Sequence, residues 1–368
     1  MRILMLVHSL RRGGAERVLL EIALGLQKRR HQVEVIAWLD VDEYQDACYS
    51  SIKRHYLLSK DKYLWIRSIP RSAVELRKLV RQFNPDVIEI HSPNVTWVAA
   101  YAWLRIPCIH VLHGYGSITR YGSLKDNLIR YLSHLVDWLL SCSHIAVTES
   151  MIPVASSYFK LNCSDYTVVS NGVDLTKYLF KEKQPDDAPI IIMIGTLSPN
   201  KGQVLGIRAF IILLKSIPDA KLLIVGDGVD RDRLHALVQN EGLTGKVNLL
   251  GTRDDVPEIL TKIHILWQLS ESEAMPMVVL EAMASGVPVI GFDVRGTRDA
   301  VVDKITGHLI PYAEVSDIAN KTVELLKDVP MYRSFSIKGR DRVEQFYDNA
   351  CMVGGHEKAM RIKIGNQA

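Results

Sequence analysis

The chain has 368 residues, of which 48% are hydrophobic and 23% are charged, and its formal net charge is +4. This length suits two α/β domains better than one, and the apolar content is sufficient for two cores, so long disordered regions are not expected. The modest charge and the lack of a basic aromatic motif argue against nucleic-acid binding.

The apolar run at the N-terminus, ILMLV at 3–7, is too short for the core of a signal peptide, and glycines and charged residues follow it. The most apolar long window, 95–112, is interrupted by Arg105 and Pro107 and falls short of a membrane span. We therefore expect a cytoplasmic chain without a transmembrane helix.

Short apolar runs alternate with segments of helical period through the first half of the chain. The run at 3–7 is followed by apolar residues at helix spacing from Ala15 to Leu26, and VEVIAW at 33–38 predicts the next strand. Further short strands are predicted at 87–90, 109–112, 145–148 and 167–169. This alternation is typical of βαβ units that build a parallel sheet.

A polar stretch bounded by proline at 179–189, LFKEKQPDDAP, interrupts this pattern and predicts a domain boundary. The alternation then restarts, with strands predicted at 190–195, 221–226, 247–251, 264–269 and 287–291. The sequence thus predicts an α/β protein with an N-terminal domain at 1–178, a second domain at 179–345, and a helical tail at 346–368 that can cross back to the first domain.

Glycines follow several of the predicted strands. Gly13 and Gly14 lie between the first strand and the first helix, and Gly226 ends the strand at 221–226. Glycine allows positive φ and a close approach to a ligand, and a following helix N-terminus favours phosphate. GGAE is not the GxGxxG pattern of dinucleotide sites, and a plain tight turn explains the two glycines equally well.

The second domain opens with GTLSPNKG at 195–202, where Lys201 precedes a predicted helix. An ammonium beside the N–H groups of a helix end suits a diphosphate, although a solvated lysine in a turn is the alternative. Loops that follow parallel strands meet at one edge of the sheet, so the loops at 195–202 and 226–228 are expected to share one crevice.

The stretch SESEAMPMVVLEAMASGVPVIG at 270–291 is the most informative one. It contains Glu273 and Glu281 in an E-x7-E pattern, with Pro276 in the first turn of a predicted helix. One carboxylate can hold two vicinal ribose hydroxyls, and another can bind a sugar or stabilise positive charge at its anomeric carbon. Solvated helix charges are the alternative, which the apolar surroundings disfavour.

Six short motifs occur in an order that resembles family 4 glycosyltransferases, which are retaining enzymes of the GT-B fold. They are GGAE at 13–16, HG at 113–114, SNGVD at 170–174, KG at 201–202, GDG at 226–228 and E-x7-E at 273–281. The resemblance extends from Met1 to about Tyr347, and the last motif is its most specific part. It implies two Rossmann-like domains whose parallel sheets face a central cleft.

The resemblance also implies roles for the motifs. The glycines at 13–14 would approach the donor diphosphate or the acceptor, Lys201 would neutralise the diphosphate, and Glu281 would hold the ribose. His113 would lie near the donor sugar and Glu273 beneath its ring, as the two catalytic residues. A packed or capping histidine is the alternative for His113. The other implied substrate-binding residues are Thr196, Gly226, Arg253, Val256, Ala274, Met275, Pro276, Met277 and Val278.

Two positions depart from the family pattern. Thr196 stands where the family often has an arginine, so the leaving diphosphate loses one cation unless another basic side chain replaces it. The later GG-x-x-E element reads RGTRD at 295–299. These changes bear on donor preference and rate more than on the fold.

No metal and no resident cofactor are expected, since the nucleotide sugar is a co-substrate. The triplets at 40–42 and 230–232 match the DxD pattern by which other glycosyltransferases hold a divalent ion, but such triplets are common by chance. Lys201 and helix N-termini can support charge on the leaving group without an ion.

The net positive charge is concentrated in the first 170 residues, where Lys and Arg outnumber Asp and Glu, whereas the rest of the chain carries a small acidic excess. Within the segment 60–81 the basic residues are Lys60, Lys62, Arg67, Arg71, Arg77, Lys78 and Arg81. Because apolar residues lie between them, the segment can bind an anionic membrane, which would place the chain on the inner face of the cytoplasmic membrane. A solvated helix face is the alternative.

The sequence therefore predicts a retaining glycosyltransferase of the hexosyltransferase type, which moves a sugar from a nucleotide diphosphate to a hydroxyl acceptor. A lipid-linked or cell-surface glycan intermediate is the expected acceptor. Two alternatives stay open, namely a nucleotide-sugar epimerase on the same fold and a non-catalytic subunit that binds nucleotide. The E-x7-E block argues against the epimerase, and the intact set of polar site residues argues against the silent subunit.

Overall fold

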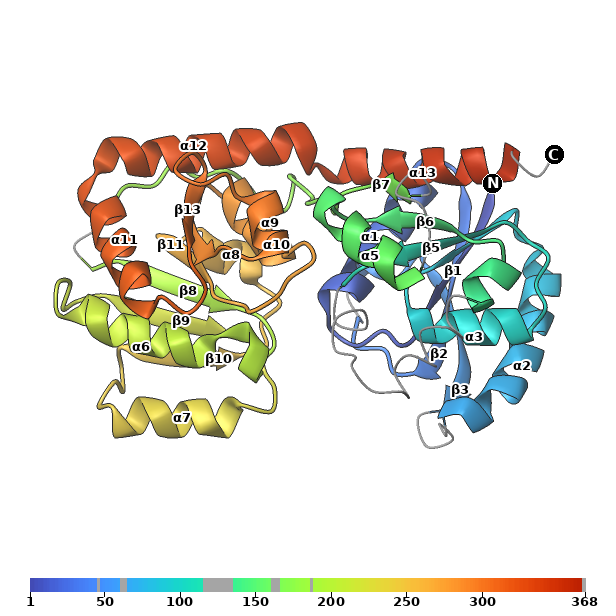
Figure 1. The fold of residues 1–368 in the computed structure, drawn as a ribbon, viewed down its shortest axis with the longest axis horizontal. Coiled ribbons are helices and arrows are strands. Elements are labelled where there is room, and N and C mark those ends of the chain that lie inside the picture. The colour runs from blue at the N-terminus through green and yellow to red at the C-terminus, as the bar shows by residue number, and fades with distance from the viewer. Residues whose placement is uncertain (45–46, 60–64, 115–134, 160–165, 186–187, 366–368) are drawn as a thin grey trace. The chain divides into compact units, whose positions relative to one another are not determined.

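The computed structural model describes residues 1–44, 47–59, 65–114, 135–159, 166–185 and 188–365 (Figure 1). The chain forms two compact units, each with its own parallel sheet. The first unit contains Met1–Asn171 together with Asn349–Ala368, and the second contains Gly172–Asp348.

The sheet of the first unit has the strand order β3-β2-β1-β4-β5-β6-β7, and all its strands are parallel. The strands are β1 (Arg2–Val7), β2 (Gln32–Asp40), β3 (Lys53–Ser59), β4 (Val87–Ile90), β5 (Cys108–Leu112), β6 (Ser143–Ala146) and β7 (Tyr166–Val168). The helices of this unit are α1 (Gly14–Lys28), α2 (Ile69–Phe83), α3 (Pro93–Tyr101), α5 (Ile152–Phe159) and α13 (Asn349–Gly365).

Helices cover both faces of this sheet, because alternate residues of a strand point to opposite sides. Apolar residues of β1, β2 and β4 form one core with α2 and α3, and there the Trp38 indole donates to Ser72 Oγ at 2.7 Å. Helices α1 and α13 lie side by side and cover the other face, where Glu89 of β4 contacts His356 of α13 (Figure 1).

The sheet of the second unit has the order β10-β9-β8-β11-β12-β13, again with parallel strands. The strands are β8 (Ile190–Ile194), β9 (Lys221–Val225), β10 (Val247–Gly251), β11 (Ile265–Gln268), β12 (Val289–Phe292) and β13 (Gly307–Ile310). The helices are α6 (Gln203–Leu214), α7 (Arg231–Asn240), α8 (Val256–Leu260), α9 (Met277–Ala284), α10 (Arg295–Ala300), α11 (Val315–Lys327) and α12 (Val329–Phe346).

The core of the second unit is closed by helices that are distant in sequence. Helix α6 packs against α11, and the buried Trp267 of β11 donates its indole N–H to Thr322 of α11 at 3.0 Å. Helix α12 packs against α9, where Ser336 Oγ donates to the carbonyl of Gly286 at 2.7 Å. The predicted fold class, α/β with two Rossmann-like halves, is confirmed.

Two edge strands were not predicted from the sequence. Strand β3 begins with the polar residues Lys53, Arg54 and His55, so its apolar run is too short to predict a strand. Strand β13 is short and begins with Gly307. Both lie at the edge of a sheet, where one side needs no partner strand and where short or charged strands are tolerated.

The chain passes between the units at Asn171–Gly172, which differs from the boundary expected near 178. Val173 lies in the second unit because its amide donates to the carbonyl of Tyr347 at 2.8 Å and it pairs with Asp348. After Asp348 the chain returns to the first unit as α13. No helix in the described part of the chain is both long and apolar enough to cross a membrane.

Candidate active site

The predicted residues of the second unit follow the carboxyl ends of neighbouring strands. The loop at 195–202 follows β8, Gly226 follows β9, the residues at 252–256 follow β10, and those at 273–278 follow β11. Because ligands bind at this edge of an open parallel sheet, the arrangement supports the expected common site.

Backbone hydrogen bonds join these loops to one another. Leu197 donates to the carbonyl of Asp227 at 2.9 Å, which joins the loops after β8 and β9. Glu271 donates to the carbonyl of Asn200 at 2.9 Å, which joins the loops after β8 and β11. The edge is therefore a connected backbone surface rather than a set of independent turns.

Glycine is required where two of these loops meet. A Cβ on Gly226, at φ +133°, would lie 2.0 Å from the carbonyl oxygen of Gly195. A Cβ on Gly202, at φ +73°, would lie 2.0 Å from the carbonyl oxygen of Leu269. Any other residue would clash with a backbone carbonyl and adopt a strained conformation.

Lys201 and Glu273 form an ion pair at this edge. Lys201 Nζ lies 2.6 Å from Glu273 Oε1, and Gln268 Nε2 donates to the same oxygen at 3.0 Å. The lysine and glutamate side chains are 27% and 15% exposed, so water screens the pair only partly. The sequence predicted both residues but not their pairing, and it did not identify Gln268, although a lone amide inside the apolar strand HILWQL was a signal.

Helix α9 carries the other carboxylate of the E-x7-E motif. Glu281 is 1% exposed, which excludes the alternative of a solvated helix charge. Ala274, Met275 and Met277 are also buried. Pro276 is the N-cap residue, with φ −74° and ψ 106°, so it lies just before the helix and not in the first turn as expected.

The remaining predicted residues of this unit lie at its surface or at helix starts. Thr196 is exposed, and its carbonyl accepts from Gln203 Nε2 at 3.0 Å. Arg253 is exposed and forms a bidentate pair with Asp255, at 2.7 and 2.6 Å, whereas Val256 begins α8. The RGTRD element starts beside the loop after β11, because Gly296 donates to the carbonyl of Glu273 at 3.1 Å.

In the first unit, Gly13 is the N-cap residue of α1 and Gly14 is the first residue of that helix. Gly13 has an extended backbone, with φ −158°, and does not use the positive φ that glycine permits. A Cβ at Gly13 would lie 2.3 Å from Glu16 Oε2, which is the end of a flexible side chain and can move away. The hydroxyl of Tyr44, which the sequence did not predict, binds both the N–H and the carbonyl of Gly13 at 3.1 and 2.8 Å.

His113 directly follows β5 and belongs to a group of polar side chains. Its Nε2 lies 2.7 Å from Nδ1 of His91, and the two rings stack at 5.0 Å between centroids. Burial, together with the charges of His356 and His110, lowers the pKa of His113 to about 3. The His113 imidazole is therefore neutral at ordinary pH. The sequence indicated His113 alone.

Asp42 of the first DxD triplet is engaged in other contacts, whereas Asp40 is exposed. Asp42 Oδ2 accepts from Arg54 Nη1 at 2.6 Å and from the Tyr56 hydroxyl at 2.7 Å. In the second triplet, Asp230 is the N-cap residue of α7 and is 8% exposed.

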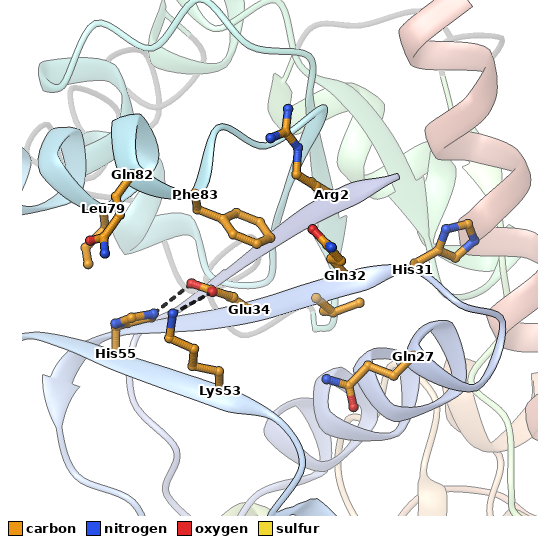
Figure 2. A pocket seen from close by; sticks show the side chains of 11 residues that line it. Arg2, Gln27, His31, Gln32, Glu34, Lys53, His55, Leu79, Gln82 and Phe83 are labelled. Atoms are coloured by element: carbon orange, nitrogen blue, oxygen red, sulfur yellow. Dashed lines mark hydrogen bonds and ion pairs between the residues drawn. The ribbon is translucent and has the colours of Figure 1, made fainter.

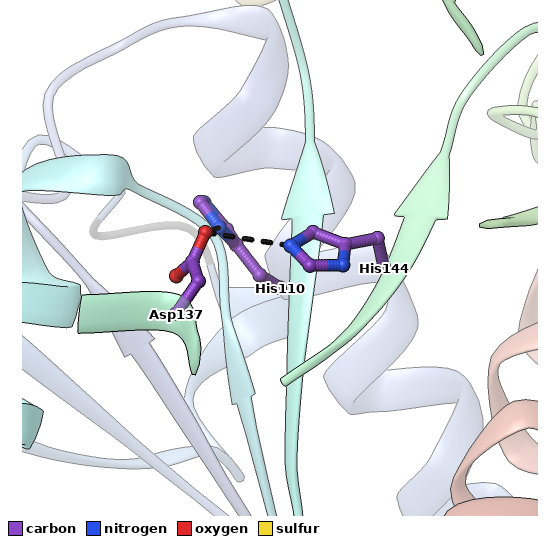
Figure 3. Close-up of side chains that lie close together, drawn as sticks. All are labelled: His110, Asp137 and His144. Atoms are coloured by element: carbon purple, nitrogen blue, oxygen red, sulfur yellow. Dashed lines mark hydrogen bonds and ion pairs between the residues drawn. The ribbon is translucent and has the colours of Figure 1, made fainter. Parts of the chain in front are cut away.

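A different cluster has the donors of a metal site (Figure 3). Asp137 Oδ2 lies 3.2 Å from His110 Nδ1 and 3.4 Å from His144 Nε2, and all three residues are buried. Two nitrogens and a carboxylate are ligands that suit zinc or iron. However, both distances are also those of a histidine N–H that donates to a shared carboxylate. Burial alone would raise the pKa of Asp137, but His110 and His144 hold it below the usual range.

A pocket of about 570 Å³ lies elsewhere, at the amino ends of the strands of the first unit (Figure 2). Its lining includes Arg2, Gln32 and Lys53, each the first residue of its strand. Glu34 there accepts from Lys53 and from His55, both at 2.8 Å. None of the predicted site residues, all of which the structure describes, lines this pocket.

Comparisons with family models, with relatives in sequence and with solved structures all find glycosyltransferases or proteins of similar fold. The family models "Glycosyltransferase Family 4" and "Glycosyl transferases group 1" match residues 12–177 and 174–342. The N-acetyl-alpha-D-glucosaminyl L-malate synthase of Bacillus anthracis is 28% identical over 300 residues, which are 77% of each chain. The UDP-Gal:alpha-D-GlcNAc-diphosphoundecaprenol alpha-1,3-galactosyltransferase of Escherichia coli is 28% identical over 284 residues, 70% of each chain. The structure of Anabaena Alr3699/HepE in complex with UDP and glucose has a TM-score of 0.83 at 20% identity, and covers 98% of this chain and 99% of that one.

We expect Asp137→Asn to lower the free energy of unfolding by about 3 kcal/mol, because the two buried histidines lose a shared anion. Urea denaturation followed by circular dichroism measures this, with Asp303→Asn, which changes a more exposed carboxylate, as the control. Dialysis against EDTA should leave the wild-type curve unchanged. Stoichiometric zinc or iron in the purified protein, together with an EDTA effect as large as that of Asp137→Asn, would show instead that the cluster holds a metal.

Proposed function

The chain belongs to glycosyltransferase family 4, and from this premise we propose that it transfers a sugar from a nucleoside diphosphate to an acceptor hydroxyl with retention of configuration. The observation that carries the proposal is the arrangement at the carboxyl ends of the strands of the second unit. There the Lys201–Glu273 ion pair lies beside the glycine turns, and Glu281 of α9 is buried. The two relatives named above are a synthase and a galactosyltransferase, which supports transfer over the epimerase and the silent subunit.

The donor would be held by groups of different chemistry. Glu281 would accept hydrogen bonds from two ribose hydroxyls, a role that suits a carboxylate shielded from water. Lys201 would face the diphosphate, and its contact with Glu273 would hold the ammonium in one place. The UDP and glucose in the structure of Anabaena Alr3699/HepE support a nucleotide sugar as the ligand class.

In the proposed reaction the acceptor oxygen attacks the anomeric carbon on the face from which the diphosphate departs. The bond from this carbon to the phosphate oxygen breaks as the bond to the acceptor forms, and the acceptor proton passes to a phosphate oxygen. Glu273 would stabilise positive charge on the sugar, and the neutral His113 would hydrogen-bond the donor sugar. No external base is needed in this step, and no metal is required by it.

The acceptor would be presented at a membrane surface. On α2 and the turn before it, Arg67, Arg71, Lys78 and Arg81 are exposed, whereas Lys60 and Lys62 lie outside the described residues. Arg77 Nε donates to the carbonyl of Ala102 at 2.6 Å. Trp103, which follows Ala102 in the chain, is 68% exposed, and exposed cations together with an exposed indole suit an anionic bilayer.

Glu281→Ala is expected to weaken nucleotide binding by on the order of 2–4 kcal/mol, because two shielded hydrogen bonds to hydroxyls are lost. Calorimetric titration with UDP and GDP measures the loss, after a thermal-shift screen of UDP-glucose, UDP-galactose, UDP-N-acetylglucosamine and GDP-mannose has identified the base. Glu324→Ala, on the exposed side of α11, is the control. Unchanged nucleotide affinity in a folded Glu281→Ala protein would remove the ribose assignment.

His113→Ala is expected to lower kcat by roughly 100-fold or more with little change in nucleotide affinity, because its hydrogen bond strengthens as charge develops in the transition state. Steady-state release of nucleoside diphosphate gives kcat, and titration with the free nucleotide gives the affinity. A kcat within about threefold of wild type would make His113 a packing residue. A parallel collapse of nucleotide affinity would place it among the binding groups.

The triple variant Arg67→Gln, Arg71→Gln and Arg81→Gln is expected to bind anionic liposomes roughly 100-fold more weakly at low salt, since each basic residue contributes about 1 kcal/mol. Co-sedimentation with phosphatidylglycerol vesicles and with neutral phosphatidylcholine vesicles measures this. Arg208→Gln, Lys215→Gln and Lys327→Gln, which remove equal charge from exposed positions of the second unit, form the control. Equal binding of the wild type to both vesicle types would return this segment to a solvated helix face.

A further inference from the structure

His113 is one end of a line of polar side chains that crosses the first unit. Its Nε2 meets Nδ1 of His91 at 2.7 Å, and Nε2 of His91 lies 3.8 Å from Glu89 Oε1. The same carboxylate oxygen contacts Nδ1 of His356, which comes from α13. Glu89, His91 and His356 are at most 5% exposed, so water neither screens these contacts nor replaces them.

The proton positions along this line follow from charge. Burial holds the pKa of His91 well below its ordinary value, and the charges of neighbouring histidines, His113 first, lower it further, so His91 carries one proton. A proton on Nε2 faces the Glu89 carboxylate, whereas a lone pair there would be repelled by it. Nδ1 of His91 is then a hydrogen-bond acceptor.

The contact between the two histidines fixes the next proton. A 2.7 Å contact between ring nitrogens requires one proton between them, and His91 Nδ1 has none to give. The proton therefore lies on Nε2 of His113. Because His113 is also neutral, its Nδ1 is left with a lone pair and acts as an acceptor.

We propose that Glu89 and His91 are positioning residues that hold His113 in the tautomer with a proton on Nε2, so that Nδ1 accepts a hydrogen bond from a sugar hydroxyl. A phosphate oxygen, which is itself an acceptor, is excluded as the partner of this nitrogen. The inference rests on the proposed role of His113 and makes its ligand specific. His356 completes the line by holding the Glu89 carboxylate from α13.

The tautomer is measured directly by long-range 15N–1H correlation spectra of the protein labelled with [15N]histidine. The His113 signals are identified by their loss in His113→Gln. We expect a protonated Nε2 and an unprotonated Nδ1 for His113 in the wild type, and a mixture of tautomers in Glu89→Gln. A wild-type His113 with its proton on Nδ1 overturns the proposal, whether or not Glu89→Gln folds.

Kinetics test the same arrangement through a conservative pair at His91. His91→Ala removes the acceptor and is expected to lower kcat by about 10-fold or more with the donor KM unchanged. His91→Asn, whose amide oxygen can take the place of Nδ1, should restore most of the activity. Release of nucleoside diphosphate from the nucleotide sugar selected in the thermal-shift screen is the assay.

The control is Glu357→Gln, which breaks the contacts of α13 with Arg29 and His31 but not the line through Glu89. It should leave kcat unchanged. Equal activity of His91→Ala and wild type overturns the positioning role, and so does equal loss in His91→Ala and His91→Asn. Because His113→Ala is measured separately, its inactivity combined with a fully active His91→Ala would refute this inference and leave the proposed function standing.

Discussion

Close backbone contact at the carboxyl ends of the strands is the constraint on which the second unit depends. The glycines at 195, 202, 226, 228 and 296 let one loop touch the carbonyl of another, in four cases at distances that leave no room for a Cβ. These contacts bring the loops after β8, β9, β11 and β12 to one edge. Only with the loops so close can Lys201, which follows β8, reach Glu273, which follows β11. The ion pair thus depends on glycine packing, including that of Gly202, the residue next to Lys201.

In the first unit the main constraint is on the His113 ring, which follows β5 and is held in one orientation by its contact with His91. The His113 ring contacts His91, and the Glu89 carboxylate lies next to His91 on its other side. Helix α13 supplies His356 to the same carboxylate, although it is separated from β4 by most of the chain. Removal of the tail would expose Glu89 and His91 to water, and water would compete for the protons that set the tautomer. Under the proposed role of His113, the tail is therefore a part of the site chemistry as well as of the core.

The sequence predicted those features whose cause is local. Apolar runs predicted the central strands, and glycines after these runs predicted the loops of the site. Both signals lie within a few residues of the structure that they predict. Strands β3 and β13 were not predicted, because an edge strand needs fewer apolar residues. Gly13 and Gly14 lie in the turn where the sequence placed them, between the first strand and the first helix, and Gly13 has an extended backbone. The two-residue spacing of Glu89 and His91 indicates one face of a strand. Nothing in the sequence, however, shows that His113 after β5 and His356 on α13 converge on that face.

The charges at the strand-end edge limit how a diphosphate can be bound there. Lys201 is 2.6 Å from Glu273, so the pair carries no net charge and attracts an anion less than a free lysine would. Thr196 removes the second cation that the family often has. Under the proposed function, oriented N–H groups would then supply part of the attraction, above all those at the start of α6, which begins at Gln203. Dipoles fixed in the backbone need no rearrangement as charge moves onto the leaving group, which is the property that a transition state with a departing diphosphate requires.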